Sequence, residues 1–390
     1  MNTTTPTTPT TPTTPAVSAA SAVPVTAARR TGWHRLTVAH KEPLTEDAVA
    51  VTLVVPPDLA ATFAAAPGRH VVVRHRPPGR ELRRTYSVCP PPGDPGALRL
   101  VIQRNTPDGF GAHARTALEA GDTLELAPPA GTFALPAIPG AHHVLIAGGS
   151  GITPLAALAA AALRDDPGCR VSLVHAARTA GTALLADELA ELKDAFVDRF
   201  TALYVLSRER RESDLFTGRV DADRLRRLLA LLGARPDRST TFALCGPWGL
   251  VETARTTLTA WGAPPENIRR ELFSADGAPP EPDPATTATP AGSAGSARPG
   301  RVRAVIGGRT TAVTMAPDDH VVLDAVLRAR PDAPYACRDG VCGSCRALVV
   351  SGEVTLGRQH ALDPRDLAAG YTLACRARPA GDDLTLDFDA

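Results

Sequence analysis

Residues 334–345 read PYACRDGVCGSC, and residues 373–379 read LACRARP. Together they place four cysteines in a C-x4-C-x2-C…C pattern, with 29 residues before the last one: Cys337, Cys342, Cys345 and Cys375. This is the spacing of a [2Fe–2S] site, in which four thiolates converge from a tight loop and one distant strand. Gly340 and Gly343 can adopt the positive φ angles that turn backbone amides toward the cluster sulfurs. The pattern therefore predicts a chain that moves single electrons.

Two other uses of the four cysteines remain open, a zinc site and a pair of disulfides. Zinc sites usually contain two short C-x2-C pairs, and the interval from Cys337 to Cys342 does not fit that pattern. The chain has seven cysteines, an odd number, and shows no secretory signal. We therefore expect a reducing cytoplasm.

The composition limits the partners to be expected. The net charge of the 390 residues is +1, without a run of basic residues interleaved with aromatics, so nothing indicates nucleic acid. Residues 144–163, VLIAGGSGITPLAALAAAAL, carry no charge and have the length of a membrane span. However, GGSGITP would break such a helix in its middle, and Pro154 suits the first turn of a new one. We expect a buried strand, a turn and a helix here, and no membrane span.

Two segments poor in large apolar residues divide the chain. Residues 1–31 form a Thr/Pro-rich tail that cannot bury a core and is expected to be disordered, and residues 275–300 form a Pro/Ala/Gly-rich linker. Residues 32–138 contain strand-like runs separated by Gly/Pro turns, which predicts an antiparallel β-barrel with one short helix near residues 112–118. Residues 139–274 alternate strands with helices, which predicts a parallel α/β sheet. The cysteine motif lies in the remaining part, residues 301–390.

Two motifs of the predicted barrel could bind a flavin. Arg84-Thr85-Tyr86-Ser87 lies at the end of a predicted strand, where an arginine can clamp a pyrophosphate, a tyrosine can cover a flavin ring and a serine can reach a ring nitrogen. An ordinary strand is the alternative for so short a motif. Residues 107–112, PDGFGA, enter the short helix, so the backbone amides around Gly109, Phe110 and Gly111 could hold the flavin pyrophosphate.

The predicted α/β sheet carries three motifs at the ends of its strands. The first is a glycine-rich turn that opens a helix and could bind a pyrophosphate: Gly148, Gly149, Ser150, Gly151, Ile152, Thr153 and Pro154. Ser207-Arg208 follows the third strand, at the sheet edge where ligands bind, although a solvated charge run is the alternative. Cys245-Gly246-Pro247 ends the fourth strand, where a lone cysteine is most often a small buried hydrophobe.

These motifs, in this order, resemble the ferredoxin–NADP reductase superfamily, in which R-x-Y-S binds flavin. Within the superfamily, the order of barrel, nicotinamide domain, linker and ferredoxin is similar to that of phenylacetyl-CoA epoxidase reductase subunits. Three further segments share this similarity, SDLFTGRVDADRL at 213–225, LDPRDLAAGYTLAC at 362–375 and LDFDA at 386–390. The resemblance implies a flavin-binding barrel, a nicotinamide-nucleotide domain and a C-terminal β-grasp ferredoxin domain.

The resemblance also implies roles for individual residues. Ser87, Thr153 and Cys245 would lie at the reacting atoms, with Thr153 near the nicotinamide and the Cys245 thiol beside nicotinamide C4. Phe273 would lie near the flavin. Ser207 and Arg208, assisted by Arg178 after the second strand, would hold the 2′-phosphate of NADPH. No catalytic acid or base is needed, because the cofactors carry the chemistry.

The implied electron path runs from NADPH to FAD, then to the [2Fe–2S] cluster and on to a di-iron oxygenase that acts on a CoA thioester. Gly111 stands where the superfamily usually has Ser or Thr, which leaves FMN open beside FAD. A reductase of another oxygenase, such as a Rieske dioxygenase or an alkane or steroid hydroxylase, is a second interpretation. A redox sensor or scaffold is a third, although a sensor would not need the nucleotide motifs.

We predict that the purified protein is brown and contains about two irons per chain, because the four-cysteine spacing is that of a two-iron cluster. Iron and labile sulfide analysis of an anaerobic preparation measures this. Zinc recovered in place of iron and sulfide would contradict the prediction.

Overall fold

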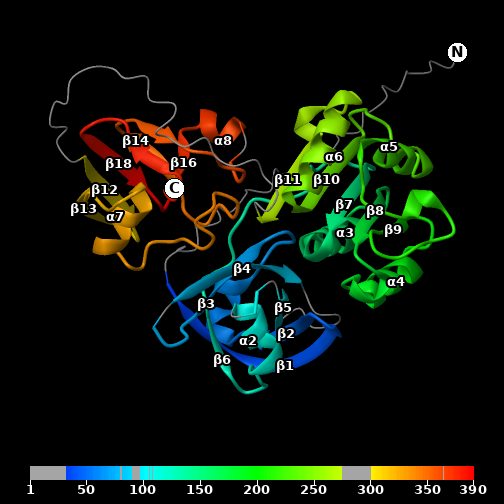
Figure 1. The fold of residues 1–390 in the computed structure, drawn as a ribbon, viewed down its shortest axis with the longest axis horizontal. Coiled ribbons are helices and arrows are strands. Elements are labelled where there is room, and N and C mark those ends of the chain that lie inside the picture. Colours follow the sequence, from blue (N-terminus) through cyan, green and yellow to red (C-terminus); the bar gives the residue numbers. More distant parts are fainter. Residues whose placement is uncertain are drawn as a thin grey trace, which may run out of the picture.

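A computed structural model describes residues 32–79, 81–89, 97–104, 106–107, 109–274, 300–362 and 364–390. The tail at 1–31, the linker at 275–299 and Asp108 of the PDGFGA motif lie outside the described residues. The described elements form a barrel, an α/β part and a C-terminal part, coloured blue to cyan, green, and yellow to red in Figure 1.

Six antiparallel strands close into a barrel in the order β1-β2-β5-β4-β3-β6, as predicted. Its elements are β1 (His34–Thr45), β2 (Ala48–Val54), α1 (Ala60–Phe63), β3 (His70–His75), β4 (Leu82–Cys89), β5 (Ala97–Gln103), α2 (Phe110–Thr116) and β6 (Thr123–Leu126). Alternate strand residues such as Leu36 and Val38 point into the barrel, and Phe110 of α2 packs against them. Helix α2 begins slightly earlier than the sequence predicted, because Gly109 is extended and caps it.

The α/β part contains five parallel strands in the order β11-β10-β7-β8-β9. Its elements are β7 (His142–Gly148), α3 (Ile152–Asp165), β8 (Arg170–Ala177), α4 (Ala186–Ala195), β9 (Phe200–Leu206), α5 (Ala222–Leu231), β10 (Thr240–Pro247), α6 (Trp248–Ala260) and β11 (Ile268–Ser274). Helices α3 and α4 share one apolar cluster of the sheet, and α5 and α6 share another. Every residue of the central strand β7 is therefore buried, as expected for a parallel strand covered on both faces.

The uncharged segment 144–163 folds as predicted, into strand β7, a short turn and helix α3. Among the described residues, no helix is both long and apolar enough to cross a membrane.

The C-terminal part is a mixed five-stranded sheet in the order β13-β12-β18-β14-β16, with a two-stranded β15-β17 ladder beside it. Its elements are β12 (Arg301–Ile306), β13 (Arg309–Thr314), α7 (Val322–Ala329), β14 (Arg346–Ser351), β15 (Val354–Leu356), α8 (Pro364–Ala368), β16 (Tyr371–Leu373), β17 (Ala377–Pro379) and β18 (Asp383–Asp387). The parallel β12–β18 pair lies at its centre, and α7 packs its apolar face onto the sheet.

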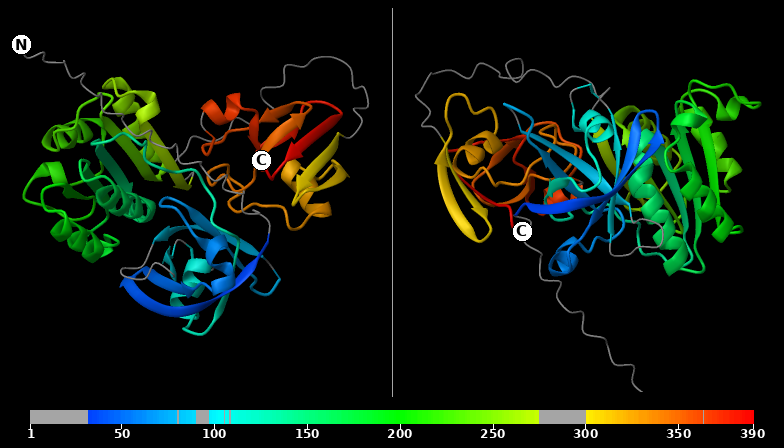
Figure 2. Two further views of the ribbon diagram at one scale, coloured as in Figure 1. Left: turned by 180° about the vertical axis from the view of Figure 1, so that it is seen from behind. Right: turned by 90° about the horizontal axis from the view of Figure 1, so that it is seen from below.

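The three parts contact one another through apolar and polar groups. Cys89 and Val101 of the barrel belong to the same buried cluster as Leu155 and Leu158 of α3. Figures 1 and 2 show the C-terminal part beside the barrel strands β3 and β4 and close to β11. The barrel therefore contacts both other parts, and its junctions with them are where cofactors could exchange electrons.

Candidate functional site

Strand β4 carries the proposed flavin motif along the side of the barrel that faces β11. Ser87 pairs with His70 of β3 and is 3 % exposed, and its hydroxyl has no hydrogen-bond partner among the described residues. The His70 Nδ1 atom lies 3.6 Å from the Glu271 carboxylate of β11. The other nitrogen of His70 and the other oxygen of Glu271 are likewise buried without partners within the described part. Such orphaned polar atoms are costly unless a ligand satisfies them, so they fit a polar ring system bound here.

His70 and Glu271 are the residues of this site that sequence reasoning did not assign. Glu271 lies in the ELF segment, whose pattern indicated only Phe273, and His70 lies in an ordinary strand run. The structure joins them across two domains, which no local pattern could indicate. Phe273, one of the predicted residues, lies near the end of β11 and is 38 % exposed.

Tyr86 of the flavin motif lies near the start of α2. The Tyr86 ring is 5.9 Å from that of Phe110, and burial raises the pKa of the Tyr86 hydroxyl. The Arg84 guanidinium donates to the carbonyl of its neighbour Arg83 at 2.9 Å. Because Arg84 is exposed, it remains accessible to an anion. A Cβ on Gly111 would lie 2.3 Å from the Gln103 carbonyl oxygen. The close approach of α2 to β5 thus explains the glycine where the superfamily usually has Ser or Thr.

The glycine-rich turn and the Cys245-Gly246-Pro247 motif contact each other directly. A Cβ on Gly151 would lie 2.2 Å from the Cys245 carbonyl oxygen, and Gly246 adopts a φ of +147° beside Gly148. Thr153 is 2 % exposed, and its hydroxyl donates to the Ser150 carbonyl at 2.9 Å. The structure therefore packs the turn that leads into Thr153 and helix α3 against Cys245, where the adjacent strands β7 and β10 end.

The Cys245 thiol is fully buried, and burial raises its pKa well above the ordinary value. The nearby Glu271 carboxylate raises it further. At neutral pH this thiol is therefore protonated, which argues against a thiolate nucleophile and leaves the side chain as a buried packing group.

Ser207 and Arg208 follow β9 and are both exposed. Their amides donate to the carbonyls of Ala177 and Arg178 at 2.9 and 2.7 Å, which fixes the ends of β8 and β9 side by side. The Arg178 side chain, in contrast, forms an ion pair with Asp47 of the barrel. Arg178 is therefore engaged across the domain junction, whereas Arg208 is exposed at the sheet edge.

The cluster loop, residues 337–345, has the backbone that the cysteine motif predicted. Gly340 and Gly343 have φ angles of +72° and +69°, and Arg338 also adopts a positive φ, of +62°. The Asp339 amide donates to the Cys337 sulfur at 3.3 Å. The Ser344 hydroxyl is buried and has no hydrogen-bond partner within the described residues. The Asp339 amide thus lies at a cysteine sulfur, and a loop with these positive φ angles fits an iron–sulfur cluster.

The four thiols are arranged as two neighbouring pairs. The hydrogen bond from Cys342 lowers the pKa of Cys337 to about 6, and the hydrogen bond with Cys375 raises the pKa of Cys345. All four are free thiols. Two thiolates for each of two irons is the ligand arrangement of a [2Fe–2S] cluster.

The cluster loop also faces the α/β part. Val341 is 5 % exposed and belongs, with the partly buried Cys337, to the apolar cluster that contains Val251 and Leu272. The cluster site thus lies next to the strand β11 that carries Glu271 toward the proposed flavin face.

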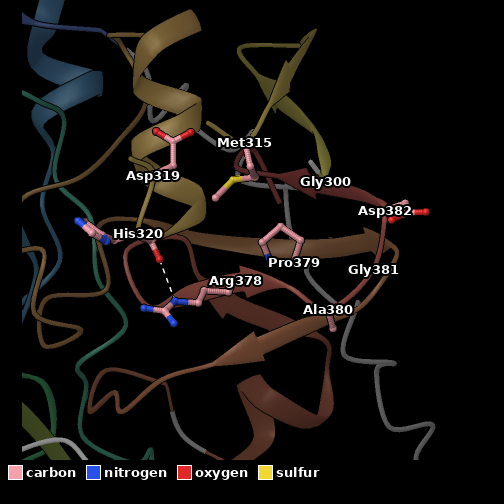
Figure 3. Close-up of a pocket in the computed structure, with 9 residues that line it drawn as sticks. All are labelled: Gly300, Met315, Asp319, His320, Arg378, Pro379, Ala380, Gly381 and Asp382. Atoms are coloured by element: carbon pink, nitrogen blue, oxygen red, sulfur yellow. Dashed lines mark hydrogen bonds between the residues drawn. The ribbon is translucent and has the colours of Figure 1, made fainter. Parts of the chain in front are cut away.

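A separate surface cavity of about 480 Å³ lies in the C-terminal part, between the start of β12 and the β17–β18 turn. Figure 3 shows the hydrogen bond that the Arg378 guanidinium donates to the His320 carbonyl. The distance from Arg378 Nε to the His320 carbonyl oxygen is 2.8 Å. None of the predicted site residues lines this cavity.

Comparison with known proteins assigns a family to each of the three parts. The oxidoreductase FAD-binding domain matches residues 35–135, the oxidoreductase NAD-binding domain matches residues 145–256, and the 2Fe-2S iron-sulfur cluster binding domain matches residues 305–380.

Relatives match over nearly the whole chain. A subunit of 1,2-phenylacetyl-CoA epoxidase from Escherichia coli is 35 % identical, over 92 % of this chain and 99 % of the relative. The ferredoxin reductase component of 3-ketosteroid-9-alpha-monooxygenase from Rhodococcus rhodochrous is 31 % identical, over 90 % of this chain and 96 % of the relative. The structure of phthalate dioxygenase reductase shares the fold, with a TM-score of 0.55 at 23 % identity, over 91 % of this chain and 98 % of that structure.

We predict that Gly151→Ala impairs binding at the proposed nicotinamide site, because the added Cβ would displace the glycine-rich turn from the Cys245 carbonyl. We expect a loss of stability of about 1–3 kcal/mol, and a selective loss of flavin reduction by NADPH while dithionite still reduces the flavin. Stopped-flow absorbance and thermal unfolding measure the two effects. Gly181→Ala, which has no heavy atom within 4 Å of the added Cβ, is the matched control. If NADPH reduced the flavin of Gly151→Ala as fast as that of the wild type, the contact of Gly151 with the Cys245 carbonyl would not matter for the nicotinamide site.

Proposed function

Since this chain belongs to the same family of FAD- and nicotinamide-dependent reductases as the phenylacetyl-CoA epoxidase subunit from Escherichia coli, with a C-terminal [2Fe–2S] domain, we propose that it supplies electrons to a di-iron oxygenase acting on a CoA thioester. The observation that carries the proposal is the match over 99 % of that relative, together with the three cofactor domains found in this chain. The chain is an electron-transfer oxidoreductase, and the identity of its acceptor is the proposed part.

When bound, the flavin accepts a hydride from the nicotinamide and releases electrons singly to the cluster. We propose that the Ser87 hydroxyl and the His70–Glu271 pair bind the polar edge of the flavin ring, because their buried polar atoms lack other partners in the described structure. Thr153 and Cys245 would shape the nicotinamide pocket where β7 and β10 end. Arg84 would bind the pyrophosphate from its exposed position.

We propose NADPH as the preferred donor, with the 2′-phosphate held by Ser207 and Arg208. Both side chains are exposed at the sheet edge where nucleotides bind in such folds. The ion pair of Arg178 with Asp47 makes Arg178 the weaker candidate for this role, although its backbone adjoins Arg208.

A steroid oxygenase is the second candidate acceptor, because the relative from Rhodococcus rhodochrous is 31 % identical over most of both chains. We propose the cytoplasm as the compartment for either function. All seven cysteines of the chain lie among the described residues as free thiols, which supports a reducing environment.

We predict that Arg208→Ala erodes the use of NADPH and leaves the use of NADH nearly unchanged. A charge-assisted contact to a phosphate is worth about 1.5–3 kcal/mol, or about ten- to a hundredfold in kcat/KM. Steady-state ferricyanide reduction with each nucleotide measures the change. Arg210→Ala, which alters another arginine of the same segment, should change neither value. Equal losses with both nucleotides would show that Arg208 does not read the 2′-phosphate.

We predict coupled consumption of NADPH and phenylacetyl-CoA when the protein is combined with O₂ and the oxygenase subunits of a phenylacetyl-CoA epoxidase. Chromatography of the thioester is the readout. Cys342→Ser, which removes one cluster ligand, should retain ferricyanide reduction and lose thioester consumption. If the wild-type protein drives a steroid oxygenase and leaves phenylacetyl-CoA intact, the proposed acceptor is wrong and the reductase assignment stands.

A further inference from the structure

A buried arginine joins the barrel to the C-terminal part. Arg83 of strand β4 is 5 % exposed, and its two terminal nitrogens donate to the carbonyls of Ala333 and Pro331, both at 3.1 Å. Its Nε donates to the Glu81 carboxylate at 2.8 Å. The guanidinium also lies 4.0 Å from the centre of the Tyr335 ring, where cation–π attraction is favourable.

All nitrogens of this guanidinium are thus occupied, and two of the three point across the domain junction. A guanidinium binds in a fixed planar fork, so it holds its partners in one relative orientation. Because the group is buried, a shift of the C-terminal part would leave a charge without partners, which is strongly unfavourable. Arg83 therefore opposes both sliding and separation of the two parts.

The position of Arg83 in the sequence connects this junction to both redox sites. It directly precedes Arg84, the first residue of the proposed flavin motif on the same strand. On the other side, Tyr335 is two residues before Cys337, the first cluster ligand. Each side of the contact is therefore only one or two residues away from a proposed redox site: Arg83 from the flavin motif, and Tyr335 from the first cluster ligand.

We propose that Arg83 is a positioning residue for electron transfer from the flavin to the cluster. Its contacts with Ala333, Pro331 and Tyr335 hold the segment that leads into the cluster loop against the strand that binds the flavin. In each transfer one electron leaves the reduced flavin and enters the oxidised cluster, with NADPH as the source. The proposal rests on the proposed flavin site at residues 84–87.

Arg199 offers a matched comparison within the α/β part. Its guanidinium lies 5.0 Å from the centre of the Phe196 ring. Its terminal nitrogens donate to the carbonyls of Asp166 and Leu163 at 3.0 and 2.7 Å. Arg199 therefore makes the same kinds of contact as Arg83, but with partners that all belong to one part. Loss of Arg199 should disturb the α/β part locally and leave the junction of the barrel with the C-terminal part intact.

The test uses the full-length protein with its cofactors and compares Arg83→Met, Tyr335→Leu and Arg199→Met. Stopped-flow absorbance separates flavin reduction by NADPH from the following reduction of the cluster. Electron transfer slows steeply as the separation of two centres grows, so we expect cluster reduction to slow at least about tenfold in Arg83→Met and Tyr335→Leu. Flavin reduction should remain within about twofold of the wild-type rate, and Arg199→Met should match wild type in both steps.

Small-angle X-ray scattering supplies a readout that does not depend on turnover. The radius of gyration should increase in Arg83→Met and Tyr335→Leu and stay constant in Arg199→Met. Unchanged cluster reduction in both junction variants, or equal slowing of both steps, would overturn the proposal. If Arg83→Met does not fold, Tyr335→Leu decides the outcome. Failure of the underlying electron path would be visible separately, because the wild-type cluster would then not be reduced by NADPH.

Discussion

Strand β4 is the element on which the arrangement of all three parts depends, because it contacts each of them within eight residues. At one end Arg83 bonds to the segment before the cluster loop. At the other end the Cys89 thiol donates to the Thr153 carbonyl at 3.3 Å, next to the glycine-rich turn. The proposed flavin motif lies between these two contacts. A single strand thus links the proposed nicotinamide, flavin and cluster sites.

The chemistry needs placement more than it needs reactive side chains, and the described residues reflect this. The polar groups near the proposed flavin are neutral or paired: a protonated Cys245 thiol, a hydroxyl at Ser87 and the His70–Glu271 pair. None of them has to exchange a proton with a substrate for a hydride to move. Their unsatisfied atoms instead form a polar surface that a ring system with hydrogen-bonding edges can complete.

Local patterns could be predicted from the sequence, and contacts between distant segments could not. The cysteine spacing predicted the positive φ angles at Gly340 and Gly343, and the strand–helix alternation predicted the parallel sheet. The Arg178–Asp47 ion pair joins residues 131 positions apart, so the expected role of Arg178 beside Arg208 took no account of it. Arg83 and Ala333 are 250 positions apart, and only the fold brings them together.

The junctions of the C-terminal part combine two kinds of contact with different consequences. Val341 joins an apolar cluster of the α/β part, and such burial favours association without fixing a direction. Arg83 adds bonds whose geometry is satisfied in one orientation only. The apolar contact alone would permit several ways of docking at similar free energy. The buried arginine selects among them, because every other orientation leaves its charge without partners, and this selectivity is what a defined electron path requires.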